Sequence, residues 1–177
     1  MLSTKIQALL NTQVTKEYYS SNLYRAMSAW FSAHDLDGFA KWYYMQAEEE
    51  YAHAKIIYNY ILEAGGRAII EAIDQPPAEW EDIQEILEET LTHEEYVTSL
   101  IYEIVAAAQE EKDFKTSQFF AWFVDEQREE EDTASTNLGR YKRLVKADER
   151  GLYLMDTELG SRTFSEPALL LTMEGRV

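Results

Sequence analysis

The stretch Glu48-Glu49-Glu50-Tyr51-Ala52-His53 lies in the middle of a long run with helical periodicity, and it decides how the chain is interpreted. Around it, buried-type residues recur at alternating steps of four and three, which is typical of a helix packed against other helices. The series is Phe39, Tyr43, Gln46, Glu50, His53, Ile57, Tyr60 and Ala64. Glu50 and His53 therefore occupy positions where Leu or Ile is expected.

A carboxylate on the buried face of a helix is unfavourable unless it is paired with a cation or binds a metal. Glu50 and His53 are three residues apart, so they lie on one face, as the Glu-x-x-His half-sites of di-iron bundles do. One such pair is more often a surface ion pair than a metal site. The interpretation therefore depends on what the other helices contribute.

The length predicts a single domain over residues 1–177. The helical spacing along it predicts an all-α fold, with a four-helix bundle at about 4–146 and a C-terminal helix and tail at about 152–177. No run of eighteen apolar residues occurs, and the first five residues do not resemble a signal peptide. The absence of Cys excludes disulfides, thiolate zinc sites and four-cysteine iron modules. A cytoplasmic location is expected.

The formal net charge of −17 comes from 33 acidic and 16 basic residues. Such a field repels nucleic acids and anionic membranes, so neither is an expected partner, and it concentrates cations near the surface. Solubility alone can explain an acidic surface. It does not explain acidic residues on the buried faces of helices.

The few Gly and Pro residues divide the chain into four long helices. The first is expected from Ser3 or Thr4 to about His34, and the second from about Asp37 to the stop at Gly65-Gly66. The connection over 67–80 is long enough to run the length of a helix pair, so the second and third helices are not a simple hairpin. The third helix is expected from near Trp80, and a short turn at 111–113 leads into the fourth.

Each of the other three helices has the same spacing, interrupted by ligand-type residues near its middle. The first helix has Ile6, Leu10, Gln13, Glu17, Ser20, Tyr24, Met27 and Phe31. The third has Ile83, Leu87, Thr90, Glu94, Val97, Ile101, Ile104 and Ala108. The fourth has Phe120, Phe123, Gln127, Glu130, Ala134, Asn137, Tyr141 and Leu144.

Together the four helices would direct one imidazole and four carboxylates into the bundle, namely His53, Glu17, Glu50, Glu94 and Glu130. Without cations these carboxylates would have to take up protons, and a network of protonated carboxyl groups is the alternative interpretation. Two divalent ions would balance their charge. Carboxylates with a single imidazole suit iron or manganese better than copper or zinc. Glu50 is best placed to bridge the two ions.

At this point the chain resembles the non-haem ferritins of bacteria and archaea, from Met1 to at least Leu159. The matching motifs are Glu17-Tyr18-Tyr19-Ser20-Ser21, Ala47 to His53, His93-Glu94, and Trp122 to Glu131. The resemblance implies a ferritin-like four-helix bundle with a long crossover between the second and third helices and a short fifth helix. It also implies a ferroxidase that oxidises Fe²⁺ with O₂ or peroxide and stores Fe³⁺ as a mineral.

The resemblance also implies the ligand sets of the two irons in each subunit. Glu17, Glu50 and His53 would hold one iron, and Glu50, Glu94 and Glu130 would hold the other.

A third iron nearby would be held by Glu49, Glu126 and Glu129, which share Glu130, and Gln127 would lie at the edge of the second site. Taken alone, Glu49 and Glu126 are better explained as residues of a solvated helix face than as ligands.

The resemblance assigns electron donation to Tyr24 and to Trp122. Tyr24 follows Glu17 by two helical turns on the same series, and plain core packing explains it equally well. The haem-carrying bacterioferritins resemble this core but place Met directly after the bridging Glu and a second Glu-x-x-His on the last helix. Here Tyr51 follows Glu50 and the fourth helix has no second Glu-x-x-His, so haem is not expected.

Two functions remain open. The first is iron storage in a hollow shell, which the resemblance implies has 24 subunits. The second is a di-iron or di-manganese redox enzyme of low oligomeric state, acting on a small oxidant such as peroxide. Leu152, Leu154, Met155 and Leu159 follow a complete bundle, so we expect them to be buried between copies of the chain, which favours the shell.

Overall fold

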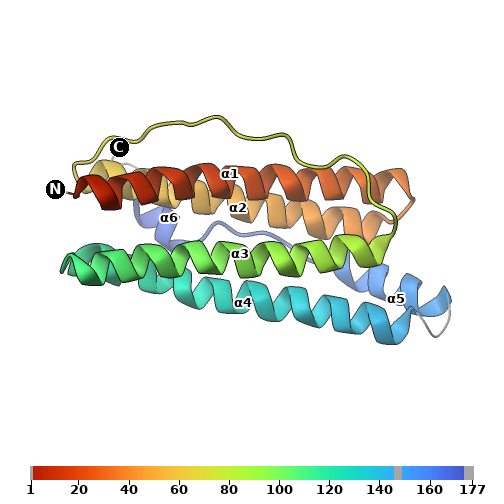
Figure 1. Ribbon diagram of the computed structural model, residues 1–177. Helices are drawn as coiled ribbons and strands as arrows, with labels where there is room; N and C mark the ends of the chain where they lie inside the picture. Colours follow the sequence, from red (N-terminus) through yellow and green to blue (C-terminus); the bar gives the residue numbers. More distant parts are fainter. Residues whose placement is uncertain (1, 146–148, 174–177) are drawn as a thin grey trace. The chain divides into compact units, whose positions relative to one another are not determined.

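The computed structural model describes residues 2–145 and 149–173. Within them the chain forms helices and no strand (Figure 1). The helices are α1 Thr4–Ala33, α2 Asp37–Glu63, α3 Ile83–Glu110, α4 Phe114–Leu144, α5 Glu149–Leu159 and α6 Ala168–Met173. Residues 146 and 174–177, which the predicted bundle and tail include, lie outside the described part. None of the described helices combines the length and the apolar character needed to cross a membrane.

The chain divides into two compact units. The first comprises Met1–Glu79 and Met155–Val177, and the second comprises Trp80–Leu154.

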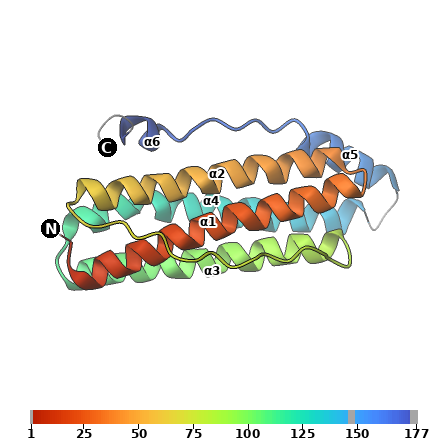
Figure 2. The ribbon, with the colours of Figure 1, turned by 90° about the horizontal axis from the view of Figure 1, so that it is seen from above.

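In the first unit, α1 and α2 pack side by side as a hairpin (Figures 1 and 2). The Ser3 hydroxyl caps α1 by accepting a hydrogen bond from the Ile6 amide at 3.1 Å, as its residue type predicts. The Ser21 hydroxyl joins the helices by donating to the Ala47 carbonyl at 2.7 Å. α2 ends before Gly65, whose φ of 75° explains why glycine stands there.

The predicted buried faces of both helices are confirmed. All eight residues of the first series are buried. Seven of the eight in the second series are buried, and Ala64, beyond the last residue of α2, is half-buried. Glu17, Glu50 and His53 are thus core residues of the first unit.

The connection after α2 has neither helix nor strand and runs along α1, which confirms the predicted crossover (Figure 1). Asn11 holds it through both ends of its amide. Its Nδ2 donates to the Arg67 carbonyl at 3.1 Å, and its Oδ1 accepts from the Ile69 amide at 2.8 Å. The Arg67 amide donates to Gln7 Oε1 at 2.8 Å. These bonds satisfy backbone groups that an extended segment otherwise leaves to water.

In the second unit, α3 and α4 form the other helix pair. α3 begins at Ile83, slightly later than expected, because Asp82 caps it by accepting from the Glu85 amide at 2.9 Å. Lys112, with φ of 59°, makes the tight turn into α4. The predicted faces are buried except at their ends, where Ile83 and Tyr141 are half-buried and Leu144 is exposed.

The C-terminal segment differs from expectation. α5 already begins at Glu149, and α6 was not predicted. Met155 and Leu159 are buried within their own chain, so the expectation that they await a second copy is wrong. Leu154 is exposed within the single chain, which burial between copies of the chain requires, and Leu152 is half-buried. α6 packs on α2 (Figure 2).

The end of α5 docks closely against the start of α2. Asp156 Oδ1 accepts from the Phe39 amide at 2.9 Å, and the Lys41 ammonium donates to the Gly160 carbonyl at 2.8 Å. Gly38 allows this approach, because a Cβ there would lie 1.7 Å from the Asp156 carbonyl oxygen. This contact holds the end of α5 at the start of α2, from where the segment after α5 continues.

We predict that Gly38→Ala displaces the end of α5 and lowers the melting temperature by roughly 2–10 °C, since overpacking costs about 1–3 kcal/mol. Amide hydrogen exchange should rise over 155–160. Gly139→Ala is the matched control, because a Cβ at Gly139 meets no atom within 4 Å. Equal melting temperatures for the two variants would contradict the prediction.

Candidate metal centre

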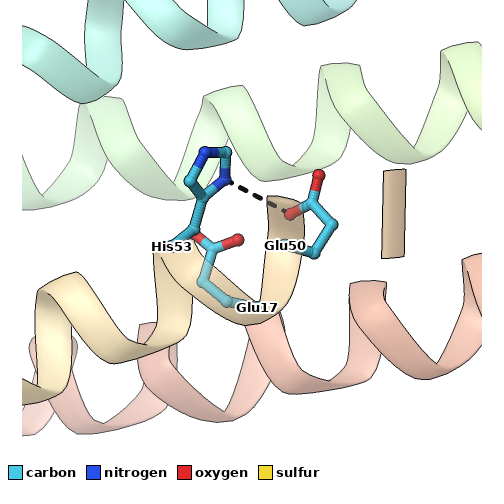
Figure 3. A group of neighbouring side chains, drawn as sticks. All are labelled: Glu17, Glu50 and His53. Carbon is cyan, nitrogen blue, oxygen red and sulfur yellow. Dashed lines mark ion pairs between the residues drawn. The ribbon is translucent and has the colours of Figure 1, made fainter. Parts of the chain in front are cut away.

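The first unit brings three predicted ligands together (Figure 3). Glu17 comes from α1, and Glu50 and His53 come from consecutive turns of α2. All three are at least 98% buried, and each offers a ligand atom within 4.8 Å of the others. Glu50 Oε2 and His53 Nδ1 lie 3.5 Å apart. Two carboxylates and an imidazole thus converge in the interior, as the i, i+3 spacing on α2 predicted.

Neutral amides hold the two carboxylates. Gln13 Nε2 donates to Glu17 Oε1 at 2.8 Å, and Gln46 Nε2 donates to Glu50 Oε1 at 3.2 Å, each from one turn earlier on the same helix. Glu17 Oε2 is buried and has no hydrogen-bond partner among the described residues. Buried acceptor atoms rarely lack a hydrogen bond, and a bound cation would satisfy this oxygen. Sequence reasoning placed Gln13 and Gln46 on the series and missed their role.

Burial raises the pKa of Glu17 well above its ordinary value, because a charged carboxylate is poorly solvated in the core. The nearby carboxylate of Glu50 raises the pKa of Glu17 further, whereas His53 and the hydrogen bond from Gln13 lower it. The metal-free core therefore favours the protonated form of Glu17 more than water does. A divalent cation bound beside Glu17 would favour its ionised form instead.

In the second unit, Glu94 on α3 and Gln127 on α4 are in contact. Gln127 Nε2 lies 3.2 Å from Glu94 Oε2, 3.3 Å from the Glu94 carbonyl and 3.4 Å from Thr98 Oγ1. Both residues are buried, and so is Glu130, which follows Gln127 by one turn. This unit repeats the pattern of the first, in which an uncharged amide donates to a buried carboxylate.

The residues predicted for a third ion are more accessible than the others. Glu49 and Glu126 are half-buried, whereas the Glu129 side chain is 73% exposed and lies 3.9 Å from the Arg128 guanidinium. Glu49 forms an ion pair with Arg162, which sequence reasoning missed. Arg162 stands alone in the tail, outside any motif, so no pattern could have marked it.

Tyr24 is fully buried, and its ring centroid lies 5.9 Å from that of Tyr43. Trp122 is half-buried and packs edge-on against Phe123 at 4.8 Å. Both aromatic residues predicted as electron donors thus pack against another aromatic ring. The donor set as a whole, made of carboxylate oxygens with one imidazole and no thiolate, fits Fe²⁺ or Mn²⁺.

Comparison with known proteins gives a consistent result. The model of a family described as "Ferritin-like domain" matches residues 7–144. A bacterial non-haem ferritin-like protein of Haemophilus influenzae is 41% identical over 91% of this chain and 97% of its own length. A bacterial non-haem ferritin of Staphylococcus epidermidis is 40% identical over 94% of this chain and 99% of its own.

Solved structures agree. The open-pore ferritin of Archaeoglobus fulgidus is 38% identical and superposes with a TM-score of 0.89 over 92% of this chain and 98% of that one. An engineered closed form of the same ferritin gives 0.90 over 93% and 100%. This likeness confirms the predicted fold class, an all-α ferritin-like four-helix bundle with a long crossover and a short C-terminal helix.

We predict that Glu17→Gln stabilises the metal-free protein at neutral pH, raising its melting temperature by at least about 2 °C. In the wild type the raised pKa of Glu17 gives stability that is complete below about pH 4.5, the ordinary value, and is lost as pH rises through the folded-state pKa. The glutamine cannot ionise, so the melting temperature should fall less between pH 5 and 8.

The control is Glu95→Gln, at an exposed position of α3. A melting temperature of Glu17→Gln that falls with pH as steeply as that of the wild type would show that Glu17 is ionised in the metal-free core.

Proposed function

The chain belongs to the ferritin family, and on that basis we propose that it is a cytoplasmic iron-storage protein that oxidises Fe²⁺ at a di-iron centre within each subunit. The observation that carries this proposal is the buried group of Glu17, Glu50 and His53 with the unsatisfied oxygen of Glu17. A protein that needed only stability would have apolar residues at these positions.

The proposed centre holds two ferrous ions as substrate. Glu17, Glu50 and His53 bind the first. Glu50 bridges to the second, which Glu94 and Glu130 complete, as the family resemblance implies. Four ionised carboxylates then balance the four positive charges of two Fe²⁺ ions.

Gln127 keeps its amide nitrogen near Glu94, where it can donate a hydrogen bond to a bound oxygen species. An uncharged donor suits this place, because it stabilises negative charge on oxygen without repelling the ions.

The electron count favours a third ion and an aromatic donor. Reduction of O₂ to two waters takes four electrons and four protons, and two Fe²⁺ ions supply two electrons. A third Fe²⁺, bound by Glu49, Glu126, Glu129 and Glu130, supplies one more. Tyr24 supplies the fourth together with its phenolic proton, and three protons come from solvent. With peroxide as oxidant, two Fe²⁺ ions suffice.

The product is stored, in this proposal, inside a closed shell of 24 copies, with no haem, nucleic acid or membrane as partner. The exposed Leu154 on α5 supports it, since exposed apolar surface favours association. The net charge of −17 supports it as well, because a negative field concentrates Fe²⁺.

We predict that His53→Ala and Glu94→Ala each slow the fast oxidation of Fe²⁺ by at least about 100-fold, since even outer partners of metal ligands are worth about 10–100-fold. Anaerobic titration should show two tight ions per subunit in the wild type and fewer in each variant. Stopped-flow absorbance after mixing with O₂ measures the oxidation.

Glu95→Ala is the matched control for Glu94→Ala. It removes an exposed carboxylate from the next position of α3 and should leave both measurements unchanged. Wild-type oxidation rates in His53→Ala and Glu94→Ala would show that these residues are not ligands.

We predict that light scattering at micromolar concentration gives a mass about 24 times the 20.6 kDa of one chain. The shell should retain oxidised iron through gel filtration. A monomer or dimer that still oxidises iron would contradict storage and leave the redox enzyme of low oligomeric state as the function.

A further inference from the structure

Arg162, in the segment between α5 and α6, makes three contacts with one face of α2. Its Nη1 donates to Gln46 Oε1 at 2.6 Å, and its Nη2 pairs with the Glu49 carboxylate. Its guanidinium carbon lies 4.6 Å from the centre of the Trp42 ring. The Arg162 and Glu49 side chains are only 23% and 22% exposed, so this ion pair is largely shielded from water.

The contact with Gln46 continues to the metal centre. Gln46 is 99% buried, and its Nε2 donates to Glu50 Oε1 at 3.2 Å. A guanidinium can only donate hydrogen bonds, so the amide oxygen of Gln46 must face Arg162 and its NH₂ group must face Glu50. Arg162 thereby fixes the orientation of the amide that holds a proposed iron ligand.

The rest of the segment keeps Arg162 in place. Before it, Gly160 and Asp156 are bound to the start of α2 as described above. After it, the Lys55 ammonium lies 3.4 Å from Glu166, and α6 buries Leu170 against the unit. Because the backbone is anchored on both sides, little conformational entropy is lost when the guanidinium binds.

We propose that Arg162 is a built-in counter-cation of the metal centre, which competes with a metal ion for Glu49 and positions Glu50 through Gln46. The inference rests on the proposed function, in which Glu49 is a ligand of the third ion. A guanidinium and a metal ion at the same carboxylate repel each other, so the third ion binds only when Arg162 withdraws from Glu49. The two inner sites therefore fill first.

The coupling acts in both directions. If Arg162 lowers the affinity of Glu49 for the ion, then the ion must weaken the attachment of Arg162 by the same factor. Occupation of the third site should thus loosen the backbone around Arg162. A residue that only fastened the tail to α2 would show neither effect.

The first test is anaerobic calorimetric titration with Fe²⁺ of the assembled wild type and of Arg162→Gln. We expect the two inner ions to bind in both proteins and the third to bind about tenfold or more tightly in the variant. Arg162→Lys, which keeps the charge but not the forked donor geometry, should lie between them. Third-ion affinity that is unchanged or weaker in Arg162→Gln would overturn the proposal.

Glu166→Gln is the matched control. It removes the ion pair of Glu166 with Lys55 of α2 without touching Glu49, so all three affinities should equal those of the wild type. If the third ion bound as tightly in this control as in Arg162→Gln, Arg162 would only attach the segment to α2, and the proposal would be overturned. Failure of the wild type to bind two ions would instead reject the proposed function.

Amide hydrogen exchange gives a readout independent of oxidation. Exchange over residues 160–166 should accelerate when the third equivalent of Fe²⁺ is added anaerobically to the wild type. Glu49→Gln removes both the ion pair with Arg162 and one ligand of the third ion, so exchange there should not depend on metal. Metal-independent exchange in the wild type would overturn the proposal.

Discussion

The structure depends on the free-energy cost of placing carboxylates in the core of a helical protein. Each of the four long helices buries one, and at Glu17 the cost shows directly as a raised pKa and an oxygen without a hydrogen bond. Glu17, Glu50 and Glu94 each accept a hydrogen bond from an amide, which Gln13, Gln46 and Gln127 donate in that order. An amide donates a hydrogen bond but leaves the negative charge uncompensated, so the affinity for metal ions is kept.

The helices and the burial of the inner candidate ligands could be predicted because a single rule governs both. In a long helix the spacing of four and three fixes which residues face the core, whatever their chemistry. Glu17, Glu50, Glu94 and Glu130 were therefore identified by position first and by residue type second. The rule weakened at helix ends, as at Leu144 and Ala64, where the core no longer covers the helix.

The C-terminal segment could not be predicted in the same way. Arg162 meets Gln46 across 116 residues of sequence, and the path between α5 and α6 has no periodicity. The burial of Met155 and Leu159 within the chain depends on the approach of α5 to Gly38, a contact that only the folded backbone shows. Sequence patterns mark faces of long helices, whereas docking of a tail depends on individual contacts.

The charges around α2 are graded in a way that suits storage. Glu50, innermost, receives a hydrogen bond from a neutral amide, whereas Glu49, one residue further out, is paired with a full positive charge. An ion held where no cation competes binds tightly and reacts in place. In the function proposed above, an ion that later moves on to a mineral needs a site from which it can leave, and a guanidinium that returns to Glu49 would favour that departure. On this proposal the same turn of α2 retains ions on its inner side and releases them on its outer side.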